Sequence, residues 1–307
     1  MITLRRVAVV LVLAGLPLVL TSYQASTAGR LLAFAVLALS VDLLAGITGL
    51  PTLGQAAYFG VGAYAAALTG IHLSTNGPLQ LVIAVAAGAL SAAATGWVAV
   101  RTGGTVFLML TLAIGELVQQ VASRWSYVGG SNGLAGMPAL QLGGHTVTLP
   151  GVIYWYLLVV FLVMYAVVRV LVSSPFGRTL RGIRDNEPRM RALGYRPAAA
   201  KYAAYAAAGG VAAAGGAMWV TEARFVSPSD LGFEVAALAL LAVVIGGAGT
   251  LWGPCLGAAI VLLTRDYLPG ITGGHGPLLL GALFVLTVYV LPRGLAGTVR
   301  RRAAVAS

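Results

Sequence analysis

Charged residues are what this sequence has least of. Only 9% of its 307 residues are Asp, Glu, Lys or Arg, while 59% are hydrophobic and the mean hydropathy is +0.92. Soluble domains carry about 25% charged residues. No polar stretch is long enough to form a separate soluble domain. The composition therefore predicts an integral membrane protein, built as a single membrane-embedded domain over residues 1–307.

Cysteine, histidine and lysine are also scarce. Cys255 is the only cysteine, which excludes a disulfide framework. The three histidines, His72, His145 and His275, are far apart in the sequence, so we expect no metal site. No Gly-Lys pair occurs, which excludes a phosphate-binding loop of the GxxxxGK[ST] kind. We also find no Ser-His-Asp set in a recognisable context, so the chain is not expected to be an enzyme or to need a cofactor.

The basic residues that are present give a formal net charge of +11. They gather near the N-terminus (Arg5, Arg6), in residues 173–201 and in the tail (Arg293, Arg300, Arg301, Arg302). Segments of this kind are expected to face the cytoplasm and anionic lipid headgroups. We therefore attribute the positive charge to contact with membrane lipid and expect no nucleic-acid partner.

Residues 173–201 form the one long polar stretch, and apolar segments flank it on both sides. A basic loop between two spans is retained on the cytoplasmic side, so this stretch orients the rest of the chain. It contains seven basic residues: Arg178, Arg181, Arg184, Arg189, Arg191, Arg196 and Lys201. Only two acidic residues, Asp185 and Glu187, oppose them.

Helix-capping residues punctuate this loop. Ser174 suits an N-cap, and a second short helix can start near Asp185 or Asn186. That helix can end at Gly194, because glycine favours the left-handed position after a helix. We therefore expect two short helices, followed by a long helix that begins at Pro197.

Two short capped helices in a loop could dock into the groove of a partner protein. Met190 and Leu193 are three residues apart and are predicted to share a helix face. The alternative is that the loop only satisfies the positive-inside rule. A loop that only connects two spans needs no helix-capping residues, so their presence favours docking.

Apolar runs of about 20 residues are long enough to cross a bilayer. We favour an uncleaved first span over a signal peptide for residues 7–20. The next spans are expected at 31–50, 54–73, 79–100, 105–122, 151–172 and 202–220, with a last one at 278–291. The predicted fold is an all-α polytopic membrane protein with about 8–10 transmembrane segments.

Residues 235–263 are too long for one straight span, and the sequence GGAGTLWGP (246–254) interrupts them. A single crossing here would place the Arg-rich tail outside, against its charge. Two half-helices that re-enter from the outside around the glycine break would place it inside. We therefore predict a glycine-broken, re-entrant or hairpin element.

Two outer segments carry turn and charge signals. Gly143 and Gly144 lie between short β-prone runs and suggest a small hairpin. Glu222, Asp230 and Glu234 make the next outer loop acidic.

Asp42 and Glu116 are carboxylates within predicted spans. An Asp at a helix centre costs about 2.5–3.5 kcal/mol on insertion scales, so such residues face a bundle interior or a cavity. We treat them, with Gln55 and Tyr58, as candidates for a translocation pathway or an intramembrane polar network. A proton-coupled secondary transporter that titrates Asp42 and Glu116 is an alternative.

Four ordered motifs carry a family resemblance. They are GITGLPTLGQAAYFGVGAYAAALTG (46–70), LTLAIGELVQQV with WSYVGGSNGLAGMP, SPFGRTLRGIRDNEPRMRALG, and FVSPSDLGFEVAALALLAVVIGGAGTLWGPCLGAA. Together they resemble the LivM-type membrane permease subunits of branched-chain amino acid ABC importers. Urea and short-chain amide importers use similar permeases, so the resemblance leaves the substrate open among these classes.

The resemblance implies a permease subunit in the bacterial cytoplasmic membrane. Its implied partners are two ATP-hydrolysing subunits, a second related permease and a periplasmic or lipid-anchored binding protein. The implied ATPase-coupling residues are Arg178, Arg181, Arg184, Glu187, Arg189, Met190, Arg191, Leu193 and Gly194. The implied candidates for binding-protein docking are Tyr127, Ser131, Asn132 and Asp230.

Overall fold

The computed structural model describes residues 13–17, 21–142, 145–147, 149–271, 281 and 294–296. Within these residues the chain is all-α apart from four two-residue strands, which confirms the predicted fold class. Five described helices are long and apolar enough to cross a membrane. Most of the predicted first span and nearly all of the predicted last span lie outside the described residues, as does His275.

The long helices lie at the predicted spans, except that the helix expected at 31–50 begins earlier, at Ser22. They are α2 (Ser22–Asp42), which continues as a π-helical segment η1 (Leu43–Thr48), α3 (Gln55–His72), α4 (Gly77–Ala99), α5 (Gly104–Arg124), α6 (Pro150–Ser173), α9 (Pro197–Ala223), α10 (Phe233–Gly246) and α11 (Trp252–Ile271). The polar loop forms two short helices, α7 (Pro175–Asp185) and α8 (Glu187–Ala192).

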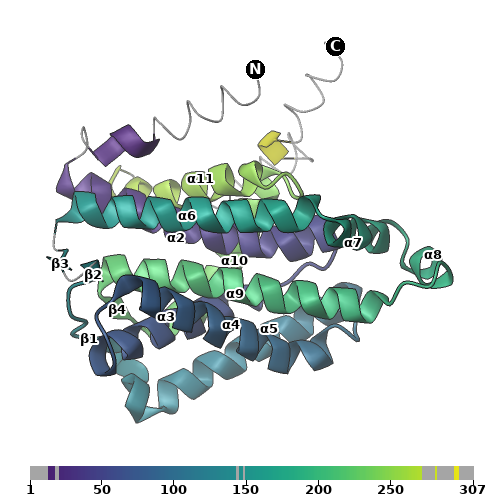
Figure 1. Cartoon of the computed structure of the whole chain (residues 1–307), viewed down its shortest axis with the longest axis horizontal. Coiled ribbons are helices and arrows are strands. Elements are labelled where there is room, and N and C mark those ends of the chain that lie inside the picture. The colour runs from purple at the N-terminus through teal and green to yellow at the C-terminus, as the bar shows by residue number, and fades with distance from the viewer. Residues whose placement is uncertain are drawn as a thin grey trace, which may run out of the picture.

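The helices lie roughly side by side, and the two ends of the bundle differ (Figure 1). Helices α7 and α8 project from one end, which we call the basic end. The short strands lie at the opposite end, which we call the far end. Helix α6 runs to the basic end and α9 returns from it, so the polar loop separates two antiparallel helices.

Helix α9 is the centre of the bundle and packs against α2, α3 and α4. Its alanines and glycines let neighbouring backbones approach closely, which is how helices associate inside a membrane. A Cβ atom on Gly216 would overlap the carbonyl oxygen of Phe59 in α3. On the α4 side, a Cβ on Gly209 would overlap the side chain of Ala92. Small residues therefore set the positions of the helices around α9.

The predicted broken element is a helical hairpin. Helix α10 has 14 residues, and α11 packs against it after a turn at 247–251. Gly247 and Gly249 adopt positive φ values of 103° and 82°, which glycine tolerates best. Arg265 of α11 approaches Glu234 at the start of α10, with 3.4 Å between their charged groups. The two arms are therefore antiparallel, and their turn lies at the opposite end from this ion pair.

Two pairs of short strands connect segments of the chain at the far end. The hairpin predicted around Gly143 and Gly144 is confirmed by its flanking strands, β2 (Gln141–Leu142) and β3 (His145–Thr146), which pair antiparallel. Strands β1 (Leu134–Ala135) and β4 (Phe225–Val226) also pair. Three single turns of 3-10 helix complete this end: η2 (Ser126–Val128), η3 (Gly130–Asn132) and η4 (Pro228–Leu231).

Candidate coupling site

The caps of α7 and α8 form as the sequence predicts. The Ser174 hydroxyl accepts a hydrogen bond from the Gly177 N–H at 3.4 Å. Asn186 is the N-cap of α8, and its Oδ1 accepts from the Arg189 N–H at 3.0 Å. Gly194 follows α8 with a φ of 85°. These caps hold two short helices that have too few residues to be stable on their own.

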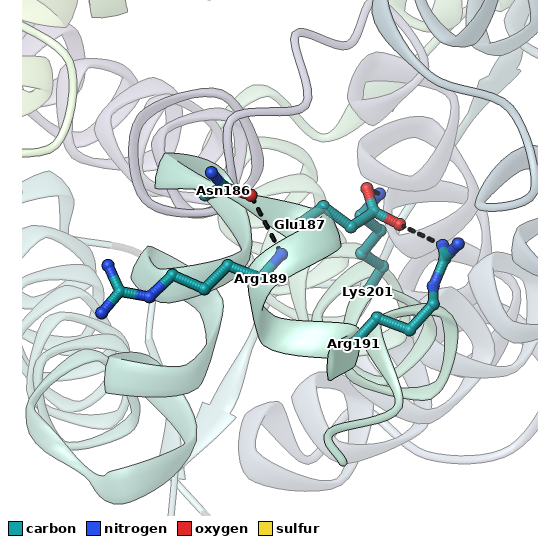
Figure 2. Close-up of polar contacts among 5 residues, drawn as sticks. All are labelled: Asn186, Glu187, Arg189, Arg191 and Lys201. Carbon is teal, nitrogen blue, oxygen red and sulfur yellow. Dashed lines mark hydrogen bonds and ion pairs between the residues drawn. The ribbon is translucent and has the colours of Figure 1, made fainter. Parts of the chain in front are cut away.

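Glu187 fastens α8 to α9 (Figure 2). Its Oε2 lies 2.5 Å from the Lys201 amine, and its Oε1 lies 3.1 Å from the Arg191 guanidinium. The Lys201 side chain is only 9% exposed, whereas that of Arg191 is 71% exposed. An exposed pair contributes little to stability, so the contact with nearly buried Lys201 is the stronger tie.

The outer surface of the α7–α8 segment is basic. The side chains of Arg178, Arg181, Arg189, Arg191 and Arg196 are all exposed. Met190 packs on Gly182 of α7, while Leu193 is 64% exposed, and that the two share a helix face stays a prediction. Leu193 is thus an exposed apolar side chain directly after α8.

The side chain of Arg184 is exposed as well, but it differs from the other arginines of α7 and α8 because its guanidinium contacts the membrane bundle. Its Nη1 donates a hydrogen bond to the carbonyl oxygen of Gly46, in η1. Its aliphatic stem passes Gly49, which has a φ of 76° and whose Cβ would lie 2.7 Å from the Arg184 Cγ. Glycine is therefore required at the place where α7 crosses the end of η1.

Asp42 lies beside this contact and is fully buried. Its Oδ1 accepts from the Gly249 N–H at 2.6 Å, and its Oδ2 accepts from the Leu251 N–H at 3.3 Å. Both donors belong to the turn between α10 and α11. Asp42 therefore joins α2 to that turn across more than two hundred residues of sequence.

The other pathway candidates lie apart from Asp42. Gln55 is buried, and neither polar atom of its side-chain amide has a hydrogen-bond partner in the described part of the chain. The Tyr58 hydroxyl bonds to Tyr205 at 2.8 Å and to Thr95 at 2.5 Å. Glu116 is instead exposed on the surface of α5. The structure thus places three candidates inside the chain and one on its surface.

The docking candidates all lie at the far end. Tyr127 is 60% exposed and stacks on His72, with 5.8 Å between ring centroids. Ser131 and Asn132 are exposed in η3. Asp230 is committed to a local cap, because it accepts from the Ser227 N–H at 2.9 Å. Burial raises the pKa of Asp230, partly offset by that hydrogen bond.

Sequence reasoning missed Gly46, Gly249 and Lys201 as members of these contacts. The glycines lie in two of the quoted motifs, yet neither motif shows that they meet. Among the described residues, no group of three His, Cys, Asp or Glu side chains is arranged to hold a metal ion.

Comparison with known proteins points to one class of transporter. Residues 23–288 match the family model described as "Branched-chain amino acid transport system / permease component". The high-affinity branched-chain amino acid permease LivM of Salmonella typhimurium is 27% identical over 94% of this chain and 73% of its own length. LivM of Escherichia coli K12 is 28% identical over 85% of this chain and 67% of its own length.

A more distant relative is the autoinducer 2 import permease LsrC of Photorhabdus laumondii, 26% identical over 62% of this chain and 56% of its own length. No solved structure matches the chain.

Proposed function

Because the chain belongs to the branched-chain amino acid transport permease family, we propose that it is the membrane subunit of an ATP-driven importer of such amino acids. The observation that carries the proposal is the α7–α8 segment, which projects from one end of the bundle (Figure 1). Its basic outer surface and the exposed Leu193 suit docking on a separate ATP-hydrolysing subunit.

The basic end faces the cytoplasm in this proposal. Arginines at a loop between spans are retained on that side of a bacterial membrane. The far end, with exposed Tyr127 and Asn132, then faces outward and receives the solute from a separate binding protein. This orientation places the ATPase and the binding protein at opposite ends of the permease.

The surface of α5 supports a paired permease. Glu116 is exposed there beside Leu117, which is 64% exposed, and Met109, which is 69% exposed. A carboxylate within a span is too costly to place against lipid. We therefore assign this face to the contact with a second permease or to the water-filled path between the two.

The physical mechanism follows from rigid docking. ATP binding closes the two ATPase subunits, and each carries an α7–α8 segment with it. The spans attached to that segment then move, and the pathway opens to the other side. LivM relatives support branched-chain amino acids as the substrate class.

The test is reconstitution of the permease with its partner subunits in vesicles. Replacing Arg191 and Leu193 together by Ala should lower uptake of labelled leucine by about tenfold, because it removes exposed docking groups. Substrate-stimulated ATP hydrolysis should fall with it. Arg169→Ala is the matched control, since Arg169 is exposed on α6 outside the α7–α8 segment.

Unchanged uptake and unchanged stimulated hydrolysis in the double variant would contradict the docking role. Uptake of urea or an amide in place of leucine would contradict the proposed substrate class but not the ATP-driven mechanism. Uptake abolished by collapsing the proton gradient, with ATP intact, would instead support a secondary transporter.

A further inference from the structure

A three-way junction forms where α7 meets the membrane bundle. It consists of Arg184 from α7, the η1 segment with Gly46, and the turn between α10 and α11. Asp42 joins the second and third of these, because its two oxygens accept from the Gly249 and Leu251 amides. In the described part of the chain, no hydrogen bond or ion pair links the other arginines of α7 and α8 to this junction.

The three parts of the junction are closely packed. A Cβ on Gly46 would overlap both the Asp42 carboxylate and the Gly249 nitrogen. A Cβ on Gly249 would lie 3.1 Å from the Gly46 carbonyl oxygen and 3.5 Å from the Arg184 guanidinium. Backbone from η1 and from the turn is therefore in direct contact, with the guanidinium at the same point.

The backbone of η1 is irregular. It is a π-helix of six residues, and Gly49 follows it in the left-handed region. Single π-turns within an α-helix are frequent at functional sites and weaken its regular hydrogen bonding. Arg184 bonds to a carbonyl within this irregular turn rather than to regular helix.

We propose that Arg184 is the positioning residue that carries movement of α7 to the α10–α11 hairpin, through Gly46 and Asp42. This inference rests on the proposed function, since the movement of α7 comes from the ATPase. It assigns the guanidinium of Arg184 to a contact within the permease rather than to the docking surface. The ATPase moves α7, Arg184 pulls the η1 carbonyl, and Asp42 draws the turn with it.

The first test separates docking from transmission in the reconstituted complex. Arg184→Ala should keep association with the ATPase subunits, and should keep basal hydrolysis. Uptake should fall by about tenfold, so that more ATP is hydrolysed per solute. Arg184→Lys keeps one charged donor and should retain more uptake than Arg184→Ala. Arg169→Ala should stay within about twofold of the unsubstituted complex.

The second test follows the turn directly. In a Cys255→Ser background, spin labels are attached to Trp252→Cys on α11 and Trp97→Cys on α4, and they report the distance between these helices. Both tryptophan side chains are exposed. A nonhydrolysable ATP analogue should change that distance, and Arg184→Ala should abolish the change while the ATPase stays bound.

Three outcomes would overturn the link: uptake by Arg184→Ala equal to that of Arg169→Ala, loss of ATPase association in Arg184→Ala, or no label movement before any substitution at Arg184. If the unsubstituted permease bound no ATPase subunit, that result would contradict both the proposed function and the proposed role of Arg184.

Discussion

At the scale of single residues, Lys201 is both the only lysine of the chain and nearly enclosed. Its amine pairs with Glu187, which lies on a different helix. Because the chain has no other lysine side chain, acylation of a lysine by an amine-reactive reagent reports the accessibility of the Lys201 amine.

Glu187→Gln should make the Lys201 amine react faster with an acylating reagent. The substitution removes the charge that holds the amine against α8, so the segment opens more often. The extent of acylation at Lys201 is measured by mass spectrometry against time. Asp185→Asn, at the exposed end of α7, removes an equal charge as the control. Equal rates of acylation in both variants would show that Glu187 does not hold the Lys201 amine against α8.

Asn186→Ala should destabilise α8 by about 1 kcal/mol, because it removes the N-cap acceptor for the Arg189 amide. Hydrogen exchange of the amides from Arg189 to Ala192 should become faster. Asn186→Asp retains an oxygen acceptor and should exchange like the unsubstituted chain. Fast exchange in both variants would show that the cap oxygen does not stabilise α8.

At the scale of elements, α9 is held by close contacts of small residues. Gly216→Ala should destabilise the protein by about 1–3 kcal/mol, since its methyl group would overlap Phe59. Thermal unfolding of the detergent-solubilised protein measures the effect. Gly210→Ala is the control on the same helix, because its Cβ would meet its nearest neighbours at 3.4–3.5 Å.

Gly210→Ala should be neutral or slightly stabilising, since alanine favours helix more than glycine does. Similar melting temperatures for the two variants would mean that α3 and α9 do not touch at Gly216.

The elements themselves were largely predictable from the sequence. Apolar runs locate the spans, and caps such as Ser174, Asn186 and Gly194 act on amides only a few residues away. Local chemistry fixes these features, so a local pattern reveals them. One example of an irregular element that the sequence did not reveal is η1, whose π-turns end at Gly49 beside α7.

The contacts of the site were less predictable, for a physical reason. Arg184 bonds to a residue 138 positions away, and Asp42 to residues more than two hundred positions away. No periodicity links such partners. From sequence, Arg184 resembles its exposed neighbours, and Asp42 resembles a pathway carboxylate. Only the folded chain shows that both oxygens of Asp42 are used by backbone amides.

At the scale of the whole molecule, the orientation of the two ends is testable in intact cells. In a Cys255→Ser background, Leu73→Cys at the far end should react with a membrane-impermeant maleimide added outside. In cells that lack the ATPase subunits, which would otherwise cover it, Leu193→Cys at the basic end should react only after permeabilisation. Leu73 is 75% exposed and Leu193 is 64% exposed, so access within the protein is similar. The reverse pattern of labelling would show that the far end faces the cytoplasm and would contradict the proposed orientation.

The shortness of α10 has a consequence for the barrier that a solute meets. Its 14 residues rise about 21 Å, whereas the hydrocarbon layer of a bilayer is about 30 Å thick. Polar backbone at the ends of α10 therefore lies at a depth where lipid cannot satisfy it, and protein or water must cover it. A solute that passes alongside α10 would therefore meet polar backbone at a depth where the surrounding lipid offers none.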